Sequence, residues 1–138
     1  MFNIKEKELP DMKVLVLSNG ELKEKEIDNT LEALQEIVDG YIEIPYLSEV
    51  FAKNEIDVII NDEGKLIEGM KPEIAIVKKG TDRILDIVMG NCIFASHNDE
   101  GDTISLNEEQ IKIVEKELET IAYVTMELNP YLVKVLFV

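Results

Sequence analysis

An apolar run, a turn and a charged segment form the first clear pattern along the chain. Residues 14–17 are Val-Leu-Val-Leu, a combination that is typical of a buried strand. The sequence Ser18-Asn19-Gly20 follows and favours a tight turn. Residues 22–27 are mostly charged and suit the returning strand. The pattern predicts a hairpin over this part of the chain.

Apolar residues then recur at helical spacing in a first short segment. Asn29 and Glu32 have the form of a capping box, in which each residue satisfies a backbone N–H of the other. Gly40 is the expected stop, because glycine adopts the left-handed conformation at low cost. The apolar stripe of this helix consists of Leu31, Leu34, Ile37 and Val38.

A second helical segment begins after residue 107. Two overlapping caps precede it, Ser105 with Glu108 and Asn107 with Gln110. The periodicity predicts a helix from about residue 108 to residue 128, ended by the Asn-Pro pair that follows. Its expected apolar stripe comprises Ile111, Val114, Leu118, Ile121, Ala122 and Leu128.

Short strands are predicted between the two helices. Residues 41–47 mix aromatic and aliphatic side chains with Pro45, which favours an edge strand or a bulge. Residues 56–60 are typical of a strand, residues 61–64 of a turn, and residues 65–67 of the returning segment.

Two later apolar segments allow more than one interpretation. Residues 74–77 fit either a strand or a helical turn. Residues 84–95 hold two apolar runs around Gly90, which fits one hairpin or one bent strand. The whole pattern predicts an α+β fold: a mainly antiparallel sheet built from hairpins, with two helices packed on one face.

The expected organisation is one domain with an extension at each end. Residues 1–11 are predicted to be a flexible leader, residues 12–128 a single domain, and residues 129–138 an apolar, strand-like tail. The tail has three interpretations: a final strand added to the sheet, a segment folded over the core, or a strand exchanged or paired at its edge in a homodimer.

Composition and charge exclude several classes of protein. An apolar content of 46% argues against a disordered acidic chain. The single cysteine fits a reducing compartment, and no signal peptide or membrane-spanning run is visible, so a cytoplasmic protein is expected. The net charge of −15 opposes direct binding to nucleic acid or to anionic membranes.

Most of that charge is concentrated in two segments. Residues 21–43 carry eight acids and two lysines, a net charge of −6, and residues 99–119 carry the same. The acids that lie off the apolar stripes of the two helices are Glu32, Glu36, Asp39, Glu108, Glu109 and Glu119, and Glu115 lies at the edge of the second stripe. They are either the solvated faces of ordinary surface helices or a surface that imitates a phosphate array and binds a basic protein.

No combination of residues indicates catalysis, a metal or a cofactor. A nucleophilic site would have to use His97, the only histidine, and Cys92 lies in an apolar run where a thiol behaves as a small hydrophobe. The acidic loops 61–64 and 98–102 lack the spacing of a calcium loop and are better explained as turns. The protein is expected not to be an enzyme.

Several motifs in order resemble a family of uncharacterised domains, domain of unknown function 3846. They are residues 26–35 with 38–43, residues 61–66, residues 86–90 and residues 101–110. The resemblance covers about residues 12–118. It implies an origin in bacteriophages, plasmids and conjugative elements, mostly of Gram-positive bacteria, and it supplies no catalytic residues.

Together these features lead to two hypotheses from different classes. The first is a non-enzymatic binding protein of a phage or mobile element that inhibits a host nucleic-acid-binding defence protein, as antirestriction and anti-CRISPR proteins do, through nucleic-acid-mimicking acidic surfaces. The alternative is a small-ligand or nucleotide-binding domain that sequesters a signalling molecule, with Lys78, Lys79 and Arg83 near an anionic group.

Overall fold

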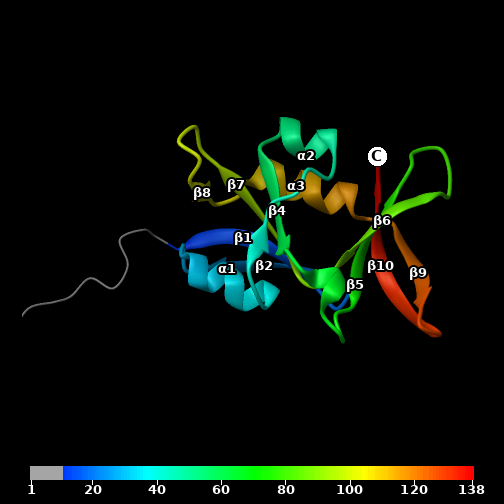
Figure 1. The fold of residues 1–138 in the computed structure, drawn as a ribbon. Coiled ribbons are helices and arrows are strands. Elements are labelled where there is room, and N and C mark those ends of the chain that lie inside the picture. Colours follow the sequence, from blue (N-terminus) through cyan, green and yellow to red (C-terminus); the bar gives the residue numbers. More distant parts are fainter. Residues whose placement is uncertain (1–10) are drawn as a thin grey trace, which may run out of the picture.

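A computed structural model describes residues 11–138, which form two β-sheets and three α-helices (Figure 1). Apart from Asp11, the predicted leader lies outside the described residues. No described helix is long and apolar enough to cross a membrane.

The first sheet has the strand order β2-β1-β7-β4-β3, and β8 pairs with β7 beside it. All of its pairings are antiparallel, beginning with the predicted hairpin of β1 and β2. Its strands are β1 (Met12–Ser18), β2 (Glu21–Ile27), β3 (Ile42–Glu43), β4 (Ile56–Asn61), β7 (Cys92–His97) and β8 (Thr103–Ile104).

The second sheet has the order β6-β5-β10-β9 and contains the predicted tail. β10 pairs antiparallel with β9 and parallel with β5. The antiparallel character expected of the fold is therefore confirmed, with one parallel pair and with two sheets in place of one. The strands are β5 (Pro72–Val77), β6 (Ile84–Met89), β9 (Ile121–Met126) and β10 (Asn129–Phe137).

Three helices and one 3-10 turn complete the described chain. They are α1 (Leu31–Val38), α2 (Glu49–Lys53), η1 (Gly64–Leu66) and α3 (Glu108–Glu117). The sequence pattern did not predict α2, which Ser48 caps by accepting from the Phe51 N–H. The prediction of a returning strand segment at residues 65–67 was wrong, because η1 includes residues 65 and 66 and no strand forms there.

The two predicted helices lie on opposite faces of the first sheet. Alternate residues of β1 point to opposite sides: Val14 and Val16 join one cluster with α1, whereas Leu15 and Leu17 join another with α3. The prediction of two helices on one face was wrong. Periodicity shows that each helix has an apolar stripe, but it does not show which face of the sheet covers that stripe.

The cluster that contains α3 forms the centre of the molecule. It lies between the first sheet, α2, α3 and the inner face of the second sheet. Phe51 of α2 and Phe94 of β7 meet edge to face, with ring centroids 5.9 Å apart. Leu136 of β10 is completely buried in the same cluster, so the end of the chain is part of the core.

The second helix ends earlier than its sequence pattern indicated. α3 stops at Glu117 with Leu118 as its cap, and β9 starts at Ile121. The prediction that this helix continues to residue 128 was wrong. Residues 120–126 are rich in β-branched and aromatic side chains that suit a pleated strand, and β9 pairs with β10 along its whole length.

The structure also differs from the sequence predictions at the two ends of α1 and over residues 84–95. Thr30 caps α1 by accepting from the Ala33 N–H, whereas the Asn29 side chain donates to the carbonyl of Thr103. Asp39, and not Gly40, adopts the left-handed conformation that closes α1. Neither interpretation of residues 84–95 was right: they form β6 and β7, and the chain passes between the two sheets at Gly90, whose φ is 89°.

Candidate functional site

All seven acids singled out from the sequence are exposed to solvent. On α1 these are Glu32, Glu36 and Asp39, which we call the α1 acids. On and after α3 they are Glu108, Glu109, Glu115 and Glu119, which we call the α3 acids. Since α1 and α3 lie on opposite faces of the first sheet, the structure does not bring the two groups together into one surface.

The α1 acids lie in a segment without any basic residue. Between Lys25 and Lys53 the chain has seven acids and no lysine, arginine or histidine. Within the described part of the chain, no ion pair neutralises an α1 acid. Lys25 on β2 lines a surface hollow together with Glu36, so the negative potential of this side is offset there only in part.

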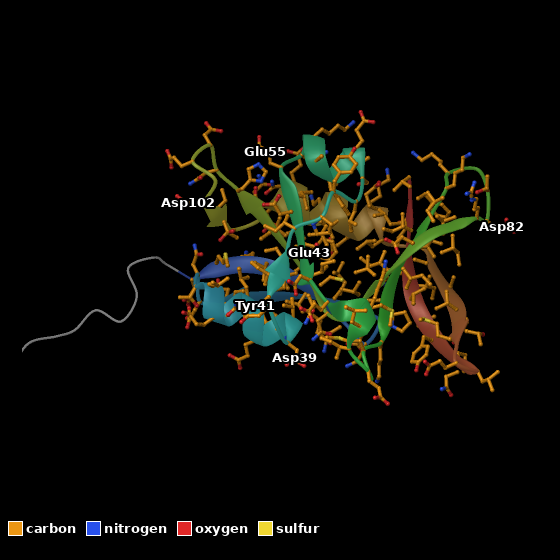
Figure 2. All side chains as sticks on the ribbon, viewed as in Figure 1. Asp39, Tyr41, Glu43, Glu55, Asp82 and Asp102 are labelled. Atoms are coloured by element: carbon orange, nitrogen blue, oxygen red, sulfur yellow. The ribbon has the colours of Figure 1, made fainter. Side chains whose placement is uncertain are left out.

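Asn61 holds the end of α1 in place. Its side-chain amide donates to the carbonyls of Val38 and Asp39, each at 3.0 Å, and it is 3% exposed. Gly40 has a φ of 156°, and a Cβ at this position would lie 2.6 Å from Nδ2 of Asn61. Figure 2 shows Asp39, Tyr41 and Glu43 near one another where α1 leads into β3.

The α3 acids are partly offset by nearby lysines. The Nζ atom of Lys13 on β1 lies 3.5 Å from Oε1 of Glu24 and 3.9 Å from Oε1 of Glu108. Two further lysines, Lys112 and Lys116, lie within α3. The predicted capping box of Asn107 and Gln110 is present in full. The charge within α3 is thus more mixed than within α1, which has no basic residue.

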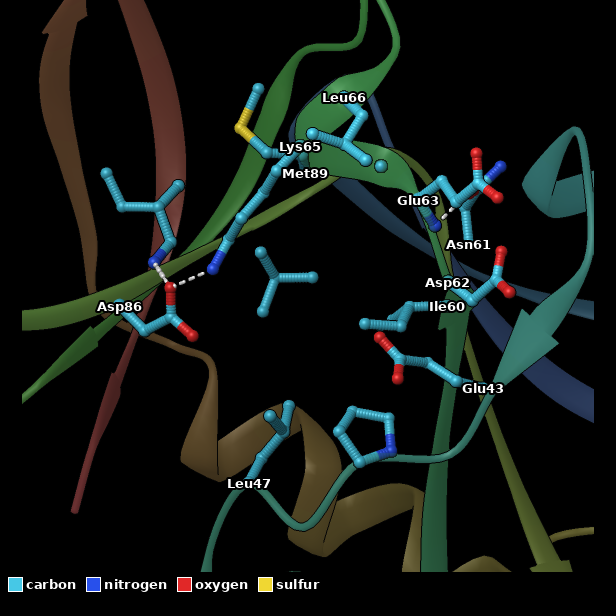
Figure 3. Close-up of a pocket in the computed structure, with 14 residues that line it drawn as sticks. Glu43, Leu47, Ile60, Asn61, Asp62, Glu63, Lys65, Leu66, Asp86 and Met89 are labelled. Atoms are coloured by element: carbon cyan, nitrogen blue, oxygen red, sulfur yellow. Dashed lines mark hydrogen bonds and ion pairs between the residues drawn. The ribbon is translucent and has the colours of Figure 1, made fainter.

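A pocket of about 170 Å³ opens between the two sheets, beside β3 (Figure 3). Its walls include the apolar side chains of Leu47, Ile60 and Val88, and the Glu43 carboxylate points into it. On the opposite side Lys65 donates to Asp86 at 2.5 Å, a bond that holds the pKa of Asp86 below its usual range. Apolar walls and an acid suit a ligand with an aliphatic stem and a positive end.

The surface around this pocket carries unusually exposed apolar side chains. Tyr41 and Tyr46, from the segment that contains β3, are 72% and 73% exposed, and Leu66 of η1 is 82% exposed. Exposed aromatic side chains next to acids are typical of protein-binding surfaces. The sequence pattern placed these residues in a strand and did not mark them as a site.

The predicted basic cluster lies elsewhere. Lys78, Lys79 and Arg83 are exposed in the loop between β5 and β6, where backbone bonds join Lys78 to Arg83 and Lys79 to Val138. None of the three lines the pocket between the sheets. The negative lining of that pocket opposes an anionic ligand such as a nucleotide.

Cys92 and His97 do not form a pair. They occupy the two ends of β7, and Cys92 is completely buried, which raises the pKa of its thiol. His97 instead places Nδ1 3.0 Å from the carboxylate of Asp57 on β4. The alternation along β7 points Cys92 and His97 to opposite faces of the sheet.

The acidic loops are organised as turns, as expected. The side-chain oxygen of Asn61 accepts from the Glu63 N–H, and that of Asn98 accepts from the N–H groups of Glu100 and Asp102. Among residues 11–138, no group of three or more acidic, histidine or cysteine side chains is arranged to hold a metal ion.

Sequence reasoning missed one buried acid. Glu73 on β5 is 2% exposed, and its carboxylate accepts from the N–H groups of Asn19 and Gly20 at 2.8 and 2.9 Å. Burial raises its pKa, although the two backbone bonds act in the opposite direction. Glu73 links the second sheet to the turn of the first hairpin. Its only signal in the sequence is a lone acid within an apolar run.

Comparison with known proteins identifies a family. The sequence profile of the domain of unknown function DUF3846 matches residues 12–119, from β1 to just after α3. No curated protein and no solved structure matches the chain significantly. The match agrees with the resemblance seen in the motifs, and the hairpin of β9 and β10 lies beyond it. The protein is therefore a member of the family of the domain of unknown function DUF3846.

Proposed function

We propose that this protein is a non-enzymatic binding protein of a phage or mobile element. Its partner is a basic protein surface, and the class we favour is a host nucleic-acid-binding defence protein, whose phosphate-binding surface the acids would occupy. The observation that carries the proposal is the group of α1 acids, which are exposed, form no ion pair with any residue of the described range 11–138, and lie in a segment without bases.

The position of the helices changes which acids belong to the proposed surface. Acids on opposite faces of one sheet do not contact a single flat partner at the same time. The α1 acids are the better candidates, because Lys13, Lys112 and Lys116 offset the α3 acids. Complementary charge of this kind accelerates association and disfavours other partners.

The pocket between the sheets adds a means of anchoring the partner. A lysine or arginine side chain can lay its aliphatic stem along Leu47 and Ile60 and place its charged end at Glu43. Tyr41 and Tyr46 supply exposed aromatic area on the same segment. Aromatic side chains next to charged groups frequently dominate the energy of protein interfaces.

Two matched triple variants test the proposal. Glu32→Gln/Glu36→Gln/Asp39→Asn neutralises the α1 acids, and Glu109→Gln/Glu115→Gln/Glu119→Gln removes the same charge from the α3 side. Each is immobilised beside the wild type and incubated with host lysate over a series of salt concentrations. We expect the α1 variant to lose a basic, nucleic-acid-binding partner that the wild type and the α3 variant retain at low salt.

Competition with duplex DNA then tests the mimicry itself. A partner that uses its nucleic-acid-binding surface should be released from the immobilised protein by added DNA, and its retention should fall as salt rises. The proposal would be contradicted if the amount of partner retained did not change with added salt or DNA, or if the two triple variants bound the partner equally.

A further inference from the structure

The four strands that end the two sheets differ sharply in how their edges are protected. Folded proteins normally guard such edges with charge, proline, bulges, short length or a covering segment, because an open edge pairs with other chains. These four strands are β2, β3, β6 and β9, and β8 adds a further edge of only two residues beside β7.

Three of these edges carry such protection. In β2, five of seven residues are charged. β3 has only two residues, and Pro45 follows shortly after it. β6 has register irregularities against β5, and its Asp86 is bound by Lys65 of the neighbouring η1.

The fourth edge, β9, has none of these features. Its six residues, Ile-Ala-Tyr-Val-Thr-Met, include no charged residue, proline or glycine, in a chain of which 31% is charged. β9 is the outermost strand of the second sheet in Figure 1. Ile121 is 53% exposed and Tyr123 75% exposed, and Leu132, which lies opposite Tyr123 on β10, is 39% exposed.

The hydrogen bonding of β9 shows which backbone groups are available. The carbonyl of Thr120 accepts from the N–H of Val135 on β10. Because bonding alternates along an antiparallel pair, Ala122, Val124 and Met126 direct their backbone groups toward β10. The N–H and C=O groups of Tyr123 and Thr125 therefore point outward from the sheet.

We propose that β9 pairs antiparallel with β9 of a second copy of this chain, forming a two-fold dimer with a continuous eight-stranded sheet. A two-fold axis perpendicular to the sheet at Val124 sets Tyr123 opposite Thr125 of the second copy. These are the residues whose backbone groups point outward, so each pair exchanges two hydrogen bonds.

The absence of acids from β9 makes a second copy a suitable occupant of this edge. Two molecules with a net charge of −15 repel each other, so they meet at the lowest cost where the surface has no acids. In the proposed register Glu127, at the hairpin turn, faces Ile121 of the second copy, whereas Glu119 precedes β9 and lies beyond the hairpin turn of the second copy. No acid in the paired segment therefore lies directly opposite another acid.

Sedimentation velocity of the full chain tests the dimer. Thr125→Pro removes an outward N–H and leaves every bond to β10 intact, since proline is tolerated where an edge N–H faces solvent. Thr125→Ala is its control. We expect the wild type and Thr125→Ala to form a dimer that dissociates on dilution, and Thr125→Pro to be monomeric with an unchanged far-ultraviolet spectrum.

A second pair of variants keeps the test decisive if the proline disturbs folding. Tyr123→Glu/Thr125→Glu places like charges directly opposite each other across the proposed interface. Ile84→Glu/Leu85→Glu adds the same charge to exposed positions on the β6 edge. The first should abolish the dimer and the second should leave it in place.

Cross-linking tests the register. Residues on the two-fold axis form a pair without mutual hydrogen bonds, with Cα atoms about 4.5 Å apart, a separation that a disulfide spans. Oxidised Val124→Cys should run as a covalent dimer, and oxidised Leu128→Cys, at the exposed hairpin tip, should not. A wild type that is monomeric from micromolar to submillimolar concentration overturns the proposal and leaves a strand of a different protein as the occupant. A dimer that survives Thr125→Pro and the double glutamate variant also overturns it.

Discussion

Among single residues, Glu73 has a structural role that composition does not reveal. A carboxylate that is 2% exposed normally weakens a fold, but this one accepts two backbone N–H groups from a tight turn of another sheet. Asn19 and Gly20 both have positive φ angles, 53° and 78°, so the turn directs both N–H groups to the same side. The acid thus fixes the position of the first hairpin relative to the second sheet.

Replacing Glu73 should destabilise the protein measurably. Glu73→Ala leaves the N–H groups of Asn19 and Gly20 without their acceptor, which we expect to lower the free energy of unfolding by about 1–3 kcal/mol. Urea denaturation at neutral pH measures the change. Glu119→Ala, which removes an exposed acid, should change the free energy of unfolding by less than about 0.5 kcal/mol.

The pH dependence of Glu73 has a definite sign. Because the folded state raises the pKa of Glu73, its contribution to stability is fully present below the unfolded pKa and is lost as pH rises through the folded pKa. In Glu73→Gln the side chain is neutral at every pH, so the variant does not lose stability through ionisation at this position as pH rises. The free energy of unfolding of Glu73→Gln, relative to wild type, should therefore rise between pH 4 and pH 7; a flat difference across that range would contradict the raised pKa.

At the scale of elements, the helix ends show when local sequence is enough to predict a capping interaction. The Asn107 and Gln110 capping box was predicted from four residues and is present, because both partners belong to the same turn. The cap of α1 was misplaced by one residue, since Asn29 instead bonds to Thr103, far away in sequence. Local patterns identify capping residues, and long-range contacts decide among neighbouring candidates.

The capping box should contribute a measurable part of the stability. Asn107→Ala removes the acceptor for the Gln110 N–H at the start of α3, and we expect a loss of about 1 kcal/mol in the free energy of unfolding. Urea denaturation of Asn107→Ala and Asn107→Ser, which keeps a capping oxygen, separates the cap from other effects. The serine variant should recover most of the loss; equal losses in both would assign the effect to another contact of Asn107.

At the scale of the whole molecule, the end of the chain belongs to the core. β10 lies between β5 and β9, and Leu136 is completely buried in the central cluster. Of the three interpretations of the tail, the strand added to a sheet is confirmed. Both edges of β10 are already paired within the chain, which is why the proposed contact between copies uses β9.

One pair of substitutions measures how much the burial of β10 in the core contributes to stability. Leu136→Ala leaves a cavity in the central cluster, and we expect it to lower the free energy of unfolding by about 2–5 kcal/mol. Leu128→Ala, at a hairpin position that is 95% exposed, should change it by less than about 0.5 kcal/mol. Urea denaturation of both variants tests the difference; similar values for the two would contradict the central placement of β10.

The sequence by itself determined the local and compositional features of this protein. It marked the first hairpin, the two main helices, the exposed α1 and α3 acids and the family, because these depend on periodicity, capping residues and ordered motifs. Only the tertiary structure decided that α1 and α3 lie on opposite faces, that residues 121–126 form a strand and not part of a helix, and that Glu73 is buried. These outcomes depend on pairing and packing between residues far apart in the chain, and burial against a particular face leaves no trace in the periodicity of one segment.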